Sequence, residues 1–174
     1  FLLPAIFIYT FFYIAPVFKS FYLSFVKWNG IPAISKEFVG LQNFINIFKD
    51  PAFYNALKNV AVFIGVSFLI IMPFAYLLAL MVSSKYIKGK RFFKTVYFLP
   101  SILPSAATGL MWTLILYKSG GALNTLLMKI GLGMAQQDWL GNPKIAIFTV
   151  ALVNAWVFIG YNMIIFIAGL TNIS

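Results

Sequence analysis

Four long runs of this chain contain no charged residue, and they constrain its fold more than any other feature. They cover residues 1–18, 59–84, 95–117 and 145–174. A helix needs about 20 apolar residues to cross the hydrocarbon core of a bilayer, and a charge at its centre costs roughly 2.5–3.5 kcal/mol. We therefore predict an all-α, polytopic membrane helix bundle with spans at about residues 1–23, 59–84, 95–117 and 145–170.

The composition supports a lipid environment. Hydrophobic residues make up 62% of the 174 positions and charged residues only 9%, whereas soluble domains carry about 25% charged residues. The 13 basic residues far outnumber the 3 acidic ones, and most lie between the apolar runs. Lipid headgroups explain that placement better than a nucleic acid does, so membrane lipid is an expected partner and nucleic acid is not.

The distribution of charge predicts which loops face the cytoplasm. Residues 85–94 hold five basic residues and no acidic one. The segments 24–58 and 118–144 are longer and mix both signs. Because positive charge is retained on the cytoplasmic side, we expect loop 85–94 to be cytoplasmic and the two longer segments to be extracytoplasmic. Both ends of the chain then lie inside.

Both outer segments carry signals of local order. Asp50 and Pro51 are typical of an N-cap followed by the first residue of a helix, which would lead into the second span. A short amphipathic stretch follows Gly121 and ends near Gly131. Trp139 has the character of an interfacial anchor.

Two prolines predict an irregular third span. Pro100 and Pro104 lie four residues apart, and each removes a backbone hydrogen bond and kinks a helix. In lipid the freed carbonyls need a neighbouring helix or a cavity. The pair therefore favours a cavity-lining or mobile helix, with a simple packing kink as the alternative.

Polar and aromatic side chains share one face of the fourth span. Asn154, Phe158, Tyr161 and Asn162 fall within roughly 100° of one another on a helix, with Trp156 and Gly160 on the other side. Amides both donate to and accept from hydroxyl groups, and aromatic rings stack on sugar rings. We interpret these four residues as candidates for the substrate pathway of a neutral polyhydroxy ligand. The alternative is that they bond to neighbouring helices.

No constellation in the chain supports catalysis. The sequence has no Cys and no His, and the acidic residues Glu37, Asp50 and Asp138 all lie in the outer segments. We therefore expect neither an enzyme nor a metal site. A Walker phosphate loop is also lacking, so no cofactor is expected on this chain, and any ATP and Mg would be used by a partner.

Several recognisable stretches occur in order along nearly the whole chain: FLLPA from Phe1, SFYLSF from Ser20, WNG from Trp28, FVGLQNF from Phe38, DPAFYNALKN from Asp50, FFKTVYFLP from Phe92, WLG from Trp139 and NMIIFIAGL from Asn162. On these stretches the chain resembles the permease subunit of carbohydrate-uptake ABC importers of the maltose and glycerol-phosphate type, and it is identified as a member of that family.

This resemblance implies a six-span core, of which four spans are present here as a partial transmembrane domain. It implies a second homologous permease, a cytoplasmic ATPase dimer and an extracytoplasmic sugar-binding protein, located in the cytoplasmic membrane of a bacterium. It also implies a loop that docks the ATPase beyond Ser174, for which Ser174 would be the helix cap. We expect the sequence to continue at both ends.

The function implied is ATP-driven, binding-protein-dependent import of a sugar or oligosaccharide by alternating access. Two alternatives remain from the residues alone. One is a structural subunit of a membrane complex. The other is a secondary transporter, although no span carries the carboxylate that ion coupling uses. The residues do not indicate which sugar is carried.

Overall fold

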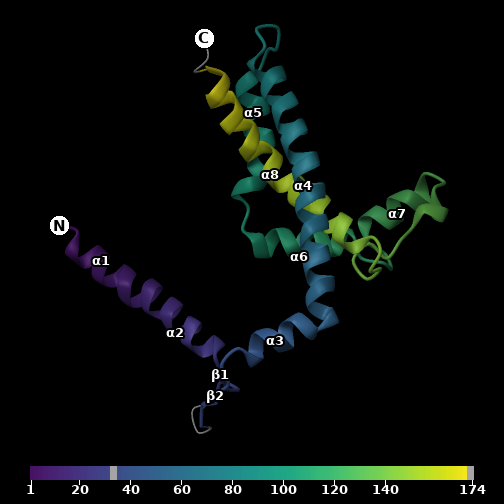
Figure 1. The fold of residues 1–174 in the computed structure, drawn as a ribbon. Helices are drawn as coiled ribbons and strands as arrows, with labels where there is room; N and C mark the ends of the chain where they lie inside the picture. The colour runs from purple at the N-terminus through teal and green to yellow at the C-terminus, as the bar shows by residue number, and fades with distance from the viewer. Residues whose placement is uncertain (32–34, 172–174) are drawn as a thin grey trace. The chain divides into compact units, whose positions relative to one another are not determined.

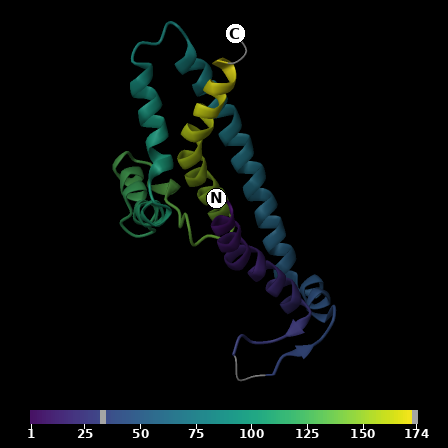
Figure 2. The same cartoon turned by 90° about the vertical axis from the view of Figure 1, so that its left-hand side faces the viewer.

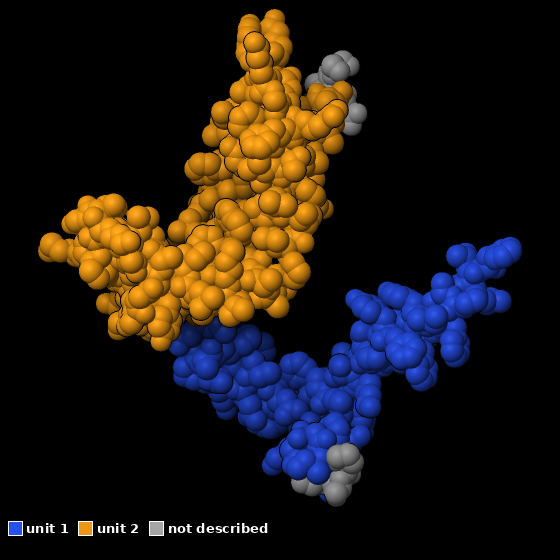
Figure 3. All heavy atoms as spheres, turned by 180° about the vertical axis from the view of Figure 1, so that it is seen from behind, with its two compact units in different colours: residues 1–57 blue, residues 58–174 orange. Residues whose placement is uncertain are grey.

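The computed structural model describes residues 1–31 and 35–171, and its regular elements are helices apart from one small hairpin (Figure 1). The chain separates into two compact units, residues 1–57 and 58–174, which are coloured separately in Figure 3. The predicted helix cap at Ser174 lies outside the described residues. The observed all-α architecture confirms the predicted fold class.

The first unit begins with a helix that contains one π-helical turn. It consists of α1 (Leu3–Tyr9), the π-helical turn η1 (Thr10–Ile14) and α2 (Ala15–Ser24). Pro16 follows the π-helical turn, and proline has no N–H to donate to the preceding turn. The turn absorbs this loss, because Ala15 N–H donates five residues back to the carbonyl of Thr10.

A small hairpin and a short helix complete the first unit. Strands β1 (Val26–Lys27) and β2 (Glu37–Phe38) pair antiparallel, with Val26 opposite Phe38. Helix α3 (Gln42–Lys49) follows. The amide of Asn43 donates to the carbonyl of Ser24 (2.9 Å) at the end of α2 and to the carbonyl of Val26 (3.1 Å) in β1. This one side chain therefore ties α3 to the end of the first span.

Helix α4 (Pro51–Ser83) is the longest element, with 33 residues. The predicted cap at its start is confirmed, because the Asp50 carboxylate accepts a hydrogen bond of 2.8 Å from Ala52 N–H. Pro73 lies inside α4, and the helix continues through it.

The second unit contains the remainder of α4 and the rest of the chain. Its elements are α5 (Lys90–Phe98), the 3₁₀ turn η2 (Leu99–Ile102), α6 (Ser105–Ile115), α7 (Ala122–Lys129), the 3₁₀ turn η3 (Gly133–Ala135) and α8 (Ala146–Thr171). Figure 2 shows α8 lying between α4 and α5.

The core of this unit is the contact between α4 and α8. Small and medium side chains meet there: Ala75, Ala79 and Val82 from α4, and Met163 and Ile167 from α8. Alanines spaced four apart let two helix backbones approach closely, which is how helices pack when both partners are otherwise surrounded by lipid. Tyr76 adds an edge-to-face ring contact with Phe166 at 5.6 Å.

Three helices in the described part of the chain are long and apolar enough to cross a membrane. They cover Leu3–Ser24, Pro51–Ser83 and Ala146–Thr171. The pair Lys90–Ile102 and Ser105–Ile115 makes a fourth if it counts as one span, although it is bent by 95°. Large apolar side chains are exposed along these helices, as expected of surfaces that face lipid.

Candidate substrate pathway

The third apolar run is broken where the sequence has its two prolines. Pro100 lies in η2, so the carbonyl of Val96 cannot receive the usual helical hydrogen bond from residue 100. Pro104 is extended, with φ −56° and ψ 133°, and Leu103 before it is extended too (ψ 137°). A residue before proline is driven away from helical geometry by steric clash. The two halves of the run therefore meet at 95°.

This break packs against a glycine of α8. Gly160 is buried, and a Cβ atom built on it would collide with the carbonyl oxygen of Tyr97. Tyr97 precedes Pro100 by three residues, at the end of α5. The backbone of the broken span therefore lies directly on the backbone of α8, and only glycine leaves enough room for this contact.

A cavity of about 450 Å³ lies at this junction. Its walls come from α4, the broken span and α8, and most of them are apolar. The lining residues are Phe74, Leu78, Val96, Tyr97, Pro100, Trp156, Ile159 and Gly160. The cavity places Pro100 beside α8, whereas Pro104 lies outside this lining.

The four candidate pathway residues lie on a different side of α8. Phe158 and Tyr161 are 44% and 49% exposed, and Asn154 and Asn162 are half-buried. The amide of Asn162 donates to the carbonyl of Phe158 in its own helix at 2.9 Å. Within the described residues, the side chains of Asn154 and Tyr161 make no hydrogen bond. Among the described residues, this face therefore makes no side-chain hydrogen bond to another helix.

This face combines two amides, one phenol and one aromatic ring without a charge. Such a set can exchange hydrogen bonds with hydroxyl groups and stack on an apolar ring face. Gly160, Trp156 and the cavity lie around the helix from it. The structure therefore brings the proline break together with Gly160 and Trp156. The four candidate residues Asn154, Phe158, Tyr161 and Asn162 lie around α8 from this junction.

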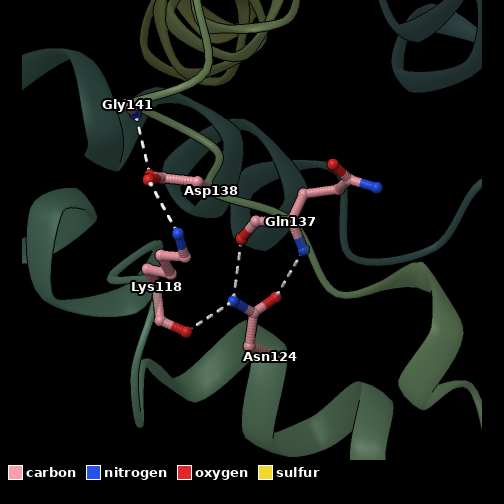
Figure 4. A network of polar contacts seen from close by, with 5 residues as sticks. All are labelled: Lys118, Asn124, Gln137, Asp138 and Gly141. Atoms are coloured by element: carbon pink, nitrogen blue, oxygen red, sulfur yellow. Dashed lines mark hydrogen bonds and ion pairs between the residues drawn. The ribbon is translucent and has the colours of Figure 1, made fainter.

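A buried amide organises the segment between α6 and α8 (Figure 4). Asn124 is 2% exposed, and its Nδ2 donates to the carbonyls of Lys118 (3.0 Å) and Gln137 (2.9 Å). Its Oδ1 accepts from the indole N–H of Trp139 at 2.8 Å. The Lys118 ammonium lies 3.6 Å from the Asp138 carboxylate, which also accepts from Gly141 N–H. Trp139 is thus a structural partner of Asn124 besides its predicted place at the interface.

Sequence reasoning did not identify Gly160, Asn124 or Asn43 as key residues. A glycine inside an apolar helix weakens it by about 1 kcal/mol relative to alanine and therefore signals close packing. That signal was available for Gly160, but its partner was not. Asn124 and Asn43 lack any local signal, because their partners lie 6 to 19 residues away along the chain.

Comparison with known proteins gives a consistent set of relatives. The chain is 33% identical over 174 residues to the probable ABC transporter permease protein YurN of Bacillus subtilis, covering 99% of this chain and 59% of YurN. It is 30% identical to the arabinooligosaccharides transport system permease protein AraP of the same organism (98% and 53%). It is also 30% identical to the lactose transport system permease protein LacF of Rhizobium radiobacter (99% and 57%). The chain matches no protein-family model.

A solved structure agrees with these relatives. A bacterial ABC transporter involved in the import of the acidic polysaccharide alginate aligns with a TM-score of 0.80 and 27% identity, covering 99% of this chain and 57% of its own. A second structure of a bacterial alginate ABC transporter, in complex with an alginate pentasaccharide-bound periplasmic protein, aligns equally well at 0.80. The chain spans somewhat more than half the length of the relatives it matches. It is a multi-pass integral membrane protein.

Proposed function

We propose that this protein is a permease subunit of an ATP-driven sugar importer. It resembles sugar ABC transporter permeases over nearly its whole length. The observation that carries the proposal is the length of the match. Relatives named for arabinooligosaccharides and lactose align with 98–99% of the chain. The aligned part of the chain includes the spans, the hairpin and the segment that contains α7.

The polar face of α8 supports a neutral sugar as the substrate class. Asn154, Tyr161 and Asn162 offer donors and acceptors, and Phe158 offers a ring face. No positive charge lies in the described length of α8. An acidic sugar would call for Arg or Lys within bonding distance, so we infer that this helix contributes to binding uncharged hydroxyl groups.

The partners follow from the same proposal. The chain has no phosphate-binding loop, so ATP and Mg are used by a separate cytoplasmic ATPase dimer. A second permease subunit would complete the pathway. An extracytoplasmic binding protein would deliver the sugar, by analogy with the periplasmic protein bound to the alginate transporter. This chain would rearrange its helices between outward-open and inward-open states and would make no covalent change to the sugar.

Variants on the polar face test the proposal. We expect Asn162→Ala and Tyr161→Phe to reduce uptake of the transported sugar about fivefold or more at an unchanged amount of protein in the membrane, because losing a hydrogen bond to a buried polar partner costs about 1–3 kcal/mol. The control is Asn142→Ala, which removes an amide bonded to the backbone N–H of Lys144, outside the spans. Equal uptake by all three variants would contradict the assignment of the face.

The energy source distinguishes the importer from its alternatives. Uptake into proteoliposomes should require ATP on the cytoplasmic side and should survive an uncoupler that collapses ion gradients. Uptake that follows an ion gradient would indicate a secondary transporter. If the intact complex moves no sugar under either condition, a structural subunit becomes the better interpretation.

A further inference from the structure

A shallow groove of about 280 Å³ lies between α5 and α8, apart from the cavity at the proline break. Its lining residues are Lys94, Thr95 and Phe98 from α5 and Ile164 from α8. At about 100° per residue, the three residues of α5 share one side of that helix, roughly opposite Val96 and Tyr97 of the larger cavity. Most of the lining is apolar, and the Thr95 hydroxyl already donates to the carbonyl of Arg91 at 3.0 Å. We call this feature the α5–α8 groove.

One end of the α5–α8 groove carries positive charge that the chain does not neutralise. Lys94 lines the groove, and Arg91 precedes it by three residues, which places both on the same side of α5. Within the described residues, neither side chain makes a hydrogen bond, and the one ion pair joins Lys118 to Asp138. The sequence has no acidic residue from 51 to 137. The first turn of α5 also lacks an acid, so the positive end of the helix dipole adds to these cations. An anion from outside the chain would stabilise this end.

The same end of the groove lies next to the end of a membrane-spanning helix. Helix α4 is long and apolar enough to cross a bilayer, and only residues 84–89 separate it from α5. The Lys90 ammonium donates to the carbonyl of Ser83 at 3.2 Å, which ties the start of α5 to the end of α4. Phe98 lies four residues beyond Lys94, about 6 Å further along the helix. Cations therefore stand at the membrane surface, and the apolar part of the groove leads from them toward the hydrocarbon.

We propose that the α5–α8 groove binds an anionic glycerophospholipid. Its phosphate lies on Lys94 and Arg91, and part of one acyl chain lies against Phe98 and Ile164. The volume is slightly below the 300–1,000 Å³ of sites that enclose a small molecule, so the groove holds only a segment of the chain. Basic pockets between membrane helices suit anionic headgroups. An acidic protein surface would match the cations, but it would not match an apolar groove below them. The inference does not depend on which solute the protein carries.

Lipid titration of the purified full-length protein in its intact complex tests the proposal. The measurement is native mass spectrometry in a neutral detergent, with phosphatidylglycerol and phosphatidylcholine that have identical acyl chains. The charge variant is Arg91→Gln with Lys94→Gln. Its matched control is Lys85→Gln with Lys88→Gln, which removes two charges from the same loop outside the groove. Ile164→Trp fills the apolar part, and Leu69→Trp, at a 70% exposed position of α4, is its control.

We expect the wild-type complex to bind one phosphatidylglycerol about tenfold or more tightly than phosphatidylcholine. The charge variant should lose this preference, Ile164→Trp should weaken phosphatidylglycerol binding, and both controls should behave as the wild type. No preference in the wild type would overturn the proposal. Equal losses in the two double variants would also overturn it, because diffuse surface charge would then explain the binding. Unchanged binding by Ile164→Trp would remove the groove from the site. Sugar uptake by the same complexes reports separately on the proposed function.

Discussion

Gly160 shows how one hydrogen atom in place of a side chain decides a helix contact. The carbonyl of Tyr97, at the end of α5, occupies the position that a Cβ on residue 160 would need. Gly169 lies in the same helix, and a Cβ there would meet no atom within 4 Å. The two glycines have the same intrinsic helix propensity. They differ in that a side chain fits at residue 169 but not at residue 160.

This difference predicts opposite outcomes for the same substitution. Gly160→Ala should lower the free energy of unfolding by about 1–3 kcal/mol, the usual cost of overpacking, and should lower Tm by roughly 2–4 °C for each kcal/mol. Gly169→Ala should be neutral or slightly stabilising, because alanine has the higher helix propensity. Thermal unfolding of both variants in the same lipid or detergent is the measurement, and equal shifts would contradict the packing seen here.

Among the elements, the broken third span differs most from a regular helix. Its two halves are separated by extended residues at Leu103 and Pro104, and its first half is held on α8 through Tyr97. Pro73 provides a contrast, because α4 continues as one helix through it. Proline alone therefore does not set a 95° bend. The broken span differs from α4 in having two prolines, with extended residues at 103 and 104 between its halves.

We expect Pro104→Ala to loosen this break, because it restores helical geometry to Leu103 and a backbone donor to residue 104. Spin labels at Arg91→Cys and Leu114→Cys lie on the two halves, and electron–electron distance measurements between them should show a longer or broader distribution in the variant. Pro73→Ala is the matched control and should leave that distribution unchanged. An unaltered distribution in Pro104→Ala would mean that tertiary contacts alone impose the bend.

At the scale of the whole molecule, the bent pair decides how many times the chain crosses the bilayer. If the bent pair is one span, residues 88 and 119 lie on opposite sides of the membrane. If the pair enters and leaves on the same side, they lie together. The charge asymmetry of loop 85–94 favours the first arrangement, with residue 88 inside.

Cysteine labelling in intact cells distinguishes these arrangements. Lys88 and Ser119 are exposed and are good sites. Gly89 is a poor one because its φ is +77°, and Gly121 has no room for a Cβ atom. An impermeant maleimide should label Ser119→Cys directly and Lys88→Cys only after the cells are permeabilised. Labelling of both from outside would indicate a re-entrant pair, and labelling of Lys88→Cys alone would reverse the orientation.

The sequence by itself determined the membrane character, the helical class and the resemblance to sugar ABC permeases. These properties depend on the transfer of side chains into lipid and on short local stretches, so they can be read without coordinates. The cap at Asp50 and the helix end at Gly131 were predictable for the same reason, since their hydrogen bonds join neighbouring residues.

Only the tertiary structure decided which of these features meet. It placed Tyr97 on Gly160 and surrounded Asn124 with partners from beyond α7. It also placed the polar face of α8 away from the core with α4. These arrangements follow from contacts between segments far apart in the chain, where close backbone approach and complete hydrogen bonding of buried groups select one packing. Periodicity along a single helix does not contain that information.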